Sequence, residues 1–355
     1  MTENKIIEIN KMPSPTWSWL KMNKAEVSLK DDIENFLPDF KAGADVAYKE
    51  EALDDVAELP EINSGTGFVL DDNFIPVGIS IPDGKKSLEP VVLTYNFASG
   101  IDAYTGQVIR GGKNSELTVI ILSSSDENAE GQQIVDTKIF ADEGAKVRII
   151  KVQLLGEKFV QLDDTASYVA ENALVEVVHV VLGGKETYVG VGSNLKGYKS
   201  SFNSELAYYC RNEQILDMNY VVLQYGKKSE CCMNVKGTVT DKSKKTYRGT
   251  IDFKQGCAGS VGQEQEETLI LSPNIVNNSI PVILCDEEDV SGEHGASIGR
   301  LGDDVLFYMQ SRGIDAKAAE RVLSRAKVQA VVSKINDAEV AEKIENFMNG
   351  IFGVE

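Results

Sequence analysis

Two segments of the chain repeat the same turn-and-strand pattern 28 residues apart. Residues 143–156 (EGAKVRIIKVQLLG) and 171–184 (ENALVEVVHVVLGG) both begin with Glu. A Gly or Asn that tolerates left-handed backbone angles follows, then Ala and a run of β-branched residues. Similar turns and strands at a fixed period are typical of a β-solenoid, in which each coil stacks on the previous one. The repeat therefore predicts a stacked all-β core.

The same character extends over residues 65–285. Strand-length apolar runs recur there between Gly, Asn, Asp and Ser, and several alternate with period two. For example, Tyr247, Gly249, Ile251 and Phe253 fall on one face of a predicted strand. No long helix pattern interrupts the region, which argues against an α/β sheet, because such a sheet needs a crossover helix after nearly every strand. A β-sandwich also fits this pattern.

The sequence divides into three parts. Residues 1–64 are irregular, with a short amphipathic helix predicted around residues 30–40 that Pro38 would end. Residues 65–296 form the predicted β core. Residues 297–355 predict three short helices, which can shield exposed edge strands at one end of a solenoid.

Capping signals set the limits of these three helices. Gly313 closes the first helix as a residue just after its C-terminus. Asp315 caps the second helix. Asn336 and Glu339 form a start similar to a capping box for the third helix, which is predicted to end near Met348.

The charge and hydrophobicity of the sequence argue against two classes of function, nucleic-acid binding and membrane binding. The chain has 36 Lys and Arg residues against 55 Asp and Glu residues, a formal charge of −19. Such a surface repels phosphate backbones and anionic lipids. No apolar run approaches the roughly 20 residues that span a bilayer, and the N-terminal residues lack the apolar centre of a signal peptide. We therefore expect a cytoplasmic protein that binds neither nucleic acid nor membrane.

Motifs for catalysis and nucleotide binding are missing from the sequence. Residues 106–114 (GQVIRGGKN) resemble a phosphate loop, but the first Gly comes one residue too early and Asn114 replaces the Ser or Thr that would bind magnesium. No GxSxG, HExxH or Cys-rich zinc pattern occurs. A β-helix carbohydrate-active enzyme, which needs acidic residues across a groove, is the remaining enzymatic alternative.

The two histidines lie in different contexts. His179 stands among β-branched residues, where we expect a structural role with a local hydrogen bond. His294 lies between Glu293 and Gly295, where small neighbours permit a ligand to approach. Imidazole binds iron, copper, nickel and zinc, and Glu293 and Cys285 are further candidate ligands nearby. A structural role in a turn is the alternative for His294, and adjacent residues on a strand would point to opposite faces.

Three segments of the chain have a specific pattern: residues 288–314 (EDVSGEHGASIGRLGDDVLFYMQSRGI), residues 249–274 (GTIDFKQGCAGSVGQEQEETLILSPN) and residues 15–23 (PTWSWLKMN). In this order they resemble the C-terminal part of the SufB/SufD family, its last core coils and an N-terminal motif of SufD-type members. Proteins of this family are scaffold components of the SUF machinery for iron–sulfur cluster assembly. The specific resemblance covers roughly the final third of the chain, and the chain looks like a compact, SufD-like member.

This resemblance implies a right-handed parallel β-helix flanked by short N-terminal and C-terminal helical segments, in agreement with the β-solenoid predicted from the repeat. It also implies a partner, the ABC-type ATPase SufC, which would bind mainly to the C-terminal helices. Leu306, Phe307, Tyr308 and Arg312 belong to the matching helix, and ordinary helix packing is the alternative role for some of them. The nucleotide site would then belong to SufC, and this chain would bind no nucleotide.

The resemblance also implies a ligand set for iron or a transient iron–sulfur cluster. His294 falls on the histidine of SufD, Gly295 replaces a SufB glutamate, and the SufB cysteine position falls near Glu266. The candidate ligands are therefore His294, with Glu293, Glu266 and Cys285.

Three hypotheses of function follow. The first is a non-catalytic scaffold that pairs with itself or with a SufB-type paralogue, works with SufC and supplies apo acceptor proteins. The second is a SufD-like accessory or iron-handling subunit without a cluster of its own. The third and most remote is the carbohydrate-active enzyme.

Overall fold

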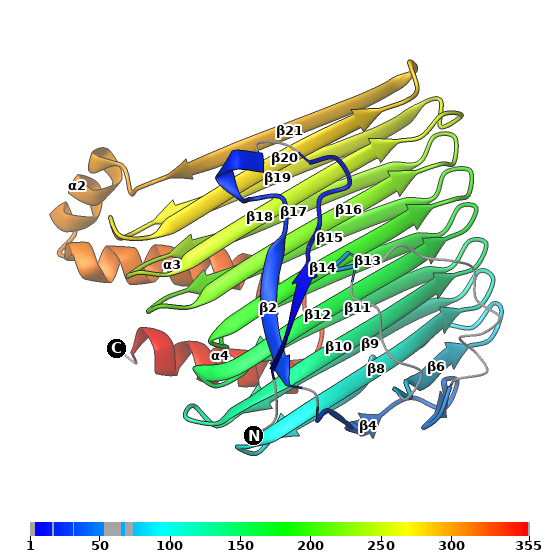
Figure 1. Ribbon diagram of the computed structural model, residues 1–355, viewed down its shortest axis with the longest axis horizontal. Helices are drawn as coiled ribbons and strands as arrows, with labels where there is room; N and C mark the ends of the chain where they lie inside the picture. Colours follow the sequence, from blue (N-terminus) through cyan, green and yellow to red (C-terminus); the bar gives the residue numbers. More distant parts are fainter. Residues whose placement is uncertain (1–3, 16–17, 31, 53–64, 68–73, 354–355) are drawn as a thin grey trace.

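The computed structural model describes residues 4–15, 18–30, 32–52, 65–67 and 74–353. Its centre is a β-helix in which successive strands alternate between two facing sheets (Figure 1). The stack runs from the cyan strands near residue 80 to the gold strands near residue 295. The β-helix predicted from the 28-residue repeat is therefore confirmed.

Each sheet is built almost entirely from parallel neighbours; only the short terminal strands β5 and β4 pair antiparallel. The first sheet contains, in spatial order, β5 (Ala47–Lys49), β6 (Val77–Ile81), β8 (Ile101–Gly111), β10 (Glu130–Ala141), β12 (Lys158–Val169), β14 (Glu186–Leu195), β16 (Ile215–Gln224), β18 (Lys244–Phe253) and β20 (Val276–Cys285). The second contains β4 (Asp39–Lys41), β7 (Val91–Phe97), β9 (Glu116–Ser125), β11 (Lys146–Leu154), β13 (Leu174–Val181), β15 (Ser201–Cys210), β17 (Glu230–Val239), β19 (Ser260–Ile270) and β21 (Val290–Gly299).

The register of the strands follows the sequence repeat. Lys146 of β11 lies beside Leu174 of β13, so residues 28 positions apart are neighbours in adjacent coils. The turns that precede these strands place Gly144 and Asn172 at φ values of 70° and 54°. Only residues that tolerate left-handed angles suit these corners. The sandwich alternative is wrong, because its sheets would be antiparallel.

The space between the two sheets is the hydrophobic core. Along β18, Tyr247, Ile251 and Phe253 are completely buried, which confirms the inward face predicted from their alternation. Burial of apolar surface at roughly 25 cal/mol per Å² is the main force that stacks the coils. Each coil therefore depends on its neighbours for a closed core, and within the described ranges the last coil has a neighbour on one side only.

The N-terminal segment folds as strands, and the helix predicted around residues 30–40 is wrong for the described residues 32–40. The short strand β3 (Glu34–Asn35) pairs with β8, and β4 pairs with β7. Phe36 packs its ring 5.0 Å from that of Phe97 at the start of the β-helix. Tertiary contacts of this apolar side chain outweigh its weak local helix pattern.

A hairpin lies across the outer face of the first sheet (blue in Figure 1). It consists of β1 (Asn4–Ile9) and β2 (Ala25–Lys30), joined by a loop that contains the 3₁₀ helix η1 (Ser18–Leu20). The apolar side chains of the hairpin pack on outward-facing residues of several coils, as do Ile9, Val27 and Leu29 on Tyr104, Ile134, Leu162 and Tyr188. The loop is anchored where Arg248 of β18 donates to the carbonyl oxygen of Met22 at 2.6 Å.

The C-terminal helices are α2 (Asp303–Ser311), α3 (Ala316–Val332) and α4 (Ala338–Phe352). Helices α3 and α4 cover the outer face of the second sheet, where Val328, Ile344 and Met348 pack against residues such as Ile150 and Val178. Their apolar faces follow helical spacing, as expected for helices that pack on one side.

The predicted caps are correct for two helices. Gly313 follows α2 at φ 86°, and the Asp315 side chain accepts from the Ala318 amide at 2.8 Å. The third helix differs: Asp337 rather than Asn336 caps α4, because its carboxylate accepts from the Val340 amide at 2.9 Å. The helix also continues beyond Met348 to Phe352.

Candidate functional site at the open end of the β-helix

The β-helix ends at two strands that have no neighbour on their outer side among the described residues. Strand β20 ends the first sheet and β21 ends the second. Every residue of β21 after Val290 is exposed to solvent. Unpaired N–H and C=O groups on such edges can pair with another strand. The end of the β-helix is therefore an open platform that carries the candidate ligand residues.

The pleat of the strands separates the predicted ligands into two groups. Residues that pair in register between parallel strands point to the same face of the sheet. His294 pairs with the buried Glu264, so His294 faces the interior side of the last coil. Glu293 pairs with the exposed Gln263 and faces outward. The structure therefore places Glu293 and His294 on opposite faces.

Cys285 lies apart from His294 although both belong to the inward-facing side. Cys285 pairs with the buried Phe253 and is the last residue of β20, whereas His294 is the fifth residue of β21. Four residues along a strand correspond to about 13 Å. The exposed Cys285 thiol lies 3.0 Å from the carbonyl oxygen of Glu287 within its own turn. The described residues contain no group of three or more His, Cys, Asp or Glu side chains arranged to hold a metal ion.

Glu266 is fully engaged inside the β-helix. Its carboxylate pairs with the ammonium group of Lys245, accepts from Thr268 at 2.9 Å and contacts the hydroxyl of Ser279. Lys245 and Glu266 are 0% and 2% exposed. Burial lowers the pKa of Lys245, and the negative charge of Glu266 opposes this shift. The side chain predicted to stand at the SufB cysteine position thus already has three partners.

Glu264 is the residue at this site that our sequence analysis missed. Its side chain is 5% exposed, and one carboxylate oxygen has no hydrogen-bond partner among the described residues. Burial raises the pKa of Glu264 to about 7 and the charge of Glu266 adds to this shift, whereas the nearby Tyr247 hydroxyl and the charge of Lys245 oppose it. The carboxylate lies over Gly249, where an added Cβ would approach its Oε1 atom to 2.3 Å. Alternation in the sequence could have shown that Glu264 and Glu266 share a face.

A depression of about 290 Å³ lies beside this edge. It is lined by Cys232, Asn234, Gln263, Glu264, Gln265, Glu293, His294 and Gly295. Polar side chains predominate, so the hollow suits a small hydrated ligand better than an apolar one.

The residues predicted to bind a partner lie on the neighbouring helix α2. This helix has no buried residue, and Phe307 and Tyr308 are 75% and 59% exposed. The guanidinium carbon of Arg312 lies 5.4 Å from the ring centre of Tyr308. Ordinary packing within the chain does not explain Phe307 and Tyr308. Exposed aromatic residues next to Arg are typical of protein interfaces.

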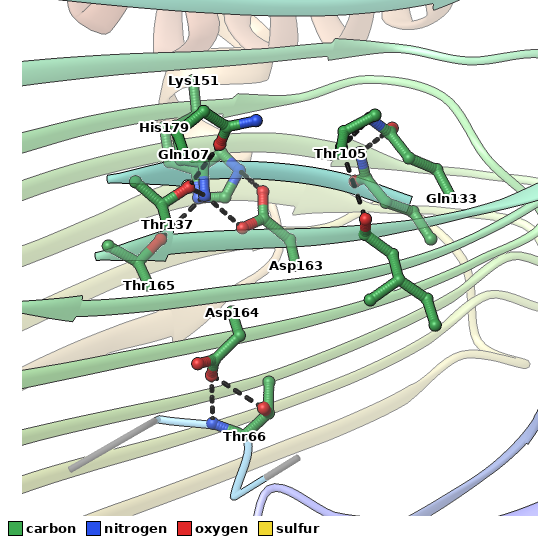
Figure 2. Close-up of polar contacts among 12 residues, drawn as sticks. Thr66, Thr105, Gln107, Gln133, Thr137, Lys151, Asp163, Asp164, Thr165 and His179 are labelled. Atoms are coloured by element: carbon green, nitrogen blue, oxygen red, sulfur yellow. Dashed lines mark hydrogen bonds and ion pairs between the residues drawn. The ribbon is translucent and has the colours of Figure 1, made fainter. Parts of the chain in front are cut away.

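His179 belongs to a polar cluster in the interior of the β-helix (Figure 2), and its strand β13 is separated from β21, the strand of His294, by β15, β17 and β19. The ammonium group of Lys151 contacts Asp163 and donates to Thr137 at 3.0 Å and to Thr165 at 2.7 Å. His179 is 1% exposed, and burial lowers its pKa to about 3, so the ring is neutral. The His179 Nε2 atom lies 3.5 Å from a carboxylate oxygen of Asp163, a local polar contact (Figure 2), although neither ring nitrogen forms a hydrogen bond with a described residue.

Comparison with known proteins assigns this architecture to a class of cluster-assembly proteins. Residues 98–327 match the family model "SUF system FeS cluster assembly, SufBD core domain". Because this match covers more than half of the chain, the protein belongs to the SufBD family of the SUF system. The resemblance inferred from the sequence is confirmed.

Individual relatives are distant in sequence. The chain is 27% identical to the iron–sulfur cluster assembly protein SufD of Bacillus subtilis over 40% of its length and 33% of the relative. It is 25% identical to the protein ABCI7, chloroplastic, of Arabidopsis thaliana over 50% of its length and 37% of the relative. A SufBD family protein of Mycobacterium leprae is 23% identical over 69% of the chain and 64% of the relative. The matches thus span less than two thirds of these relatives.

None of the described helices is both long enough and apolar enough to cross a bilayer.

Proposed function

We propose that this chain is a non-catalytic scaffold subunit for iron–sulfur cluster assembly in the cytoplasm. The observation that carries the proposal is the edge of β20 and β21, which pairs with no further strand of the described residues and presents His294 at the end of the β-helix. A second copy of the chain or a SufB-type paralogue would add its own edge strands there. Iron, or a transient iron–sulfur cluster, would be handled where the two chains meet and then passed to apo acceptor proteins.

The proposed energy source is a SufC-type ATPase that docks on α2. The exposed aromatic residues Phe307 and Tyr308, with Leu306 and Arg312, support a docking surface there. No phosphate loop occurs in the chain itself. Nucleotide would therefore bind to the ATPase. Helix α2 directly follows β21, so movement of the ATPase could be transmitted to the edge strand.

Co-purification with the ATPase, followed by mass measurement of the complex, tests the assembly. A complex that contains two copies of this chain supports a homodimeric scaffold, and a complex with a longer paralogue supports a heterodimer. Recovery of the chain alone, as a monomer, would contradict the proposal. Anaerobic reconstitution with iron and sulfide then tests the ligand: the His294→Ala variant should lose cluster absorbance, and unchanged reconstitution would contradict the role of His294.

The second hypothesis, an accessory subunit without its own cluster, is favoured by one specific observation. Glu266 stands near the SufB cysteine position and is held by Lys245, Thr268 and Ser279, so no thiolate is available there. The discriminating measurement is charge-transfer absorbance of the protein purified with the ATPase but without a SufB-type paralogue. Absorbance supports the scaffold, and its absence supports the accessory role. Membership of the SufBD family argues against the carbohydrate-active hypothesis.

A further inference from the structure

We propose that Glu264 and His294 together form a divalent-cation site within a single chain. Glu264, rather than the adjacent Glu293, would supply its carboxylate. The inference rests on the proposed function only in taking the open end of the β-helix as the functional site. It adds a ligand that sequence reasoning did not find and a site that is present before any second chain binds.

The strand register places the two side chains next to each other. Glu264 of β19 and His294 of β21 are direct neighbours on adjacent strands and face the same side. Adjacent strands lie about 4.8 Å apart. An imidazole nitrogen and a carboxylate oxygen each bind a divalent ion at about 2.0–2.2 Å, so two such neighbouring side chains can share one ion. Glu293 faces away from this position because it pairs with Gln263.

The carboxylate of Glu264 is buried and incompletely hydrogen-bonded within the described residues. A buried charge without a partner is costly, so buried carboxylates are normally paired or bind metal ions. Two residues further along, Glu266 follows this rule through Lys245 and two hydroxyl groups. Glu264 is 95% buried by the same surroundings, yet its Oε2 atom has no partner among the described residues. A cation beneath His294 would supply the missing partner.

The backbone opposite Glu264 leaves room for its carboxylate. Gly249 of β18 faces Glu264 across the interior, and its missing side chain leaves the volume that the carboxylate occupies. Any Cβ at this position would lie 2.3 Å from Oε1. The residues next to Gly249 on the inward face, Tyr247 and Ile251, are large and completely buried. The space over Gly249 thus accommodates the carboxylate group.

The ligand set defines the class of ion. One imidazole and one carboxylate, completed by water on the open side, suit ferrous iron and similar divalent ions such as Co²⁺ and Mn²⁺. Soft ions such as Cu(I) prefer thiolates, and none lies in this pair. In the proposed function the natural occupant would be ferrous iron waiting at the edge before a second chain arrives.

The test is an anaerobic titration of the purified full-length chain alone with Co²⁺, followed by visible absorbance, with Mn²⁺ binding measured by electron paramagnetic resonance. Glu264→Gln and His294→Ala should each weaken binding by roughly 10–100-fold, since even outer-shell changes have effects of this size. Glu293→Gln is the matched control and should leave affinity unchanged. Equal affinity of Glu264→Gln and the native chain, or loss of binding in Glu293→Gln, would overturn the inference.

Two further measurements distinguish loss of the ligand from loss of the fold, and this site from the proposed assembly. Thermal unfolding followed by circular dichroism should show that Glu264→Gln is folded; if it is not, Glu264→Asp keeps the charge, shortens the reach and should also bind Co²⁺ more weakly. Native affinity in a folded Glu264→Asp variant would then contradict the inference. Mass measurement with the ATPase separates the two proposals: a native complex without Co²⁺ binding would refute only this site.

Discussion

Lys245 of β18 and Glu266 of β19 form an ion pair in which both side chains are almost completely buried. The pair joins the two sheets in the coil directly below the open end, and Thr268 and Ser279 complete the hydrogen bonding of the carboxylate. Because the cost of removing both charges from water offsets their attraction, this hydrogen-bonded pair adds little to the free energy of unfolding, and its main effect is to fix the alignment of the two sheets. It also commits Glu266 to a structural role, which leaves Glu264 as the carboxylate available to a ligand.

Breaking this pair should destabilise the protein strongly. Lys245→Met leaves the Glu266 charge buried without its partner and should lower the free energy of unfolding by about 3–5 kcal/mol. The double variant Lys245→Met with Glu266→Gln should recover much of this loss. The control is Lys242→Met, which removes an exposed pair with Glu213 and should change the free energy by about 1 kcal/mol or less. Urea unfolding measures all three, and equal effects of Lys245→Met and Lys242→Met would contradict the prediction.

Asp136 should make stability depend on pH. Burial raises its pKa from the usual value of 3.8 to about 6; Asp164 adds to the shift, and Lys138 and Lys151 oppose it. The folded protein therefore holds a proton that the unfolded chain releases between about pH 4 and pH 6. The stabilisation is complete below pH 4 and is lost as the pH rises through 6, a change of about 3 kcal/mol.

The measurement for Asp136 is urea unfolding of the native chain and of Asp136→Asn from pH 4 to pH 7. Asparagine has nearly the same shape as aspartate. It also leaves in place the Tyr104 hydroxyl group, whose oxygen lies 3.4 Å from the Asp136 carboxylate. The difference in stability between the two proteins should grow in favour of the variant as the pH rises. A constant difference would show that Asp136 does not titrate in this range.

The open edge should control assembly. Ile298 of β21 pairs with Thr268 and is 39% exposed on the inward-facing side of the last coil. Ile298→Glu places a charge where another coil would stack and should reduce pairing of the chains. Val322→Glu on α3, 46% exposed, makes the same charge change away from the edge and should assemble normally. Light scattering measures the mass, and undisturbed pairing of Ile298→Glu would place the interface elsewhere.

The aromatic residues of α2 should bind the ATPase without supporting the fold. Phe307→Ala and Tyr308→Ala should each weaken binding of the ATPase by about 2 kcal/mol or more, the range of interface hot spots. The free energy of unfolding should change by about 0.5 kcal/mol or less, because both side chains are exposed. Leu88→Ala, 97% exposed on a distant loop, is the control. Calorimetric titration that shows native affinity for Phe307→Ala would exclude α2 as the docking surface.

The sequence by itself determined the features that depend on local pattern. The spacing between residues 143–156 and 171–184 fixed the register of β11 and β13, because one coil has a constant length. Gly144, Asn172 and Gly313 marked positions with left-handed angles, where the backbone restricts the residue type. Asp315 marked a helix start through its own carboxylate. Each of these signals acts over a few residues or repeats at a fixed interval.

Only the tertiary structure decided which side chains meet across the interior. Glu264, Glu266 and Glu293 are all acidic residues on neighbouring strands, and their roles differ because one faces Gly249, one faces Lys245 and one faces solvent. Gly249 and Lys245 belong to the opposite sheet, so no local pattern links them to their partners. The helix predicted near Pro38 failed for the same reason, since Phe36 gains more from packing on Phe97 than from helical neighbours. The free energy of such contacts depends on residues that are distant in the sequence and adjacent only after folding.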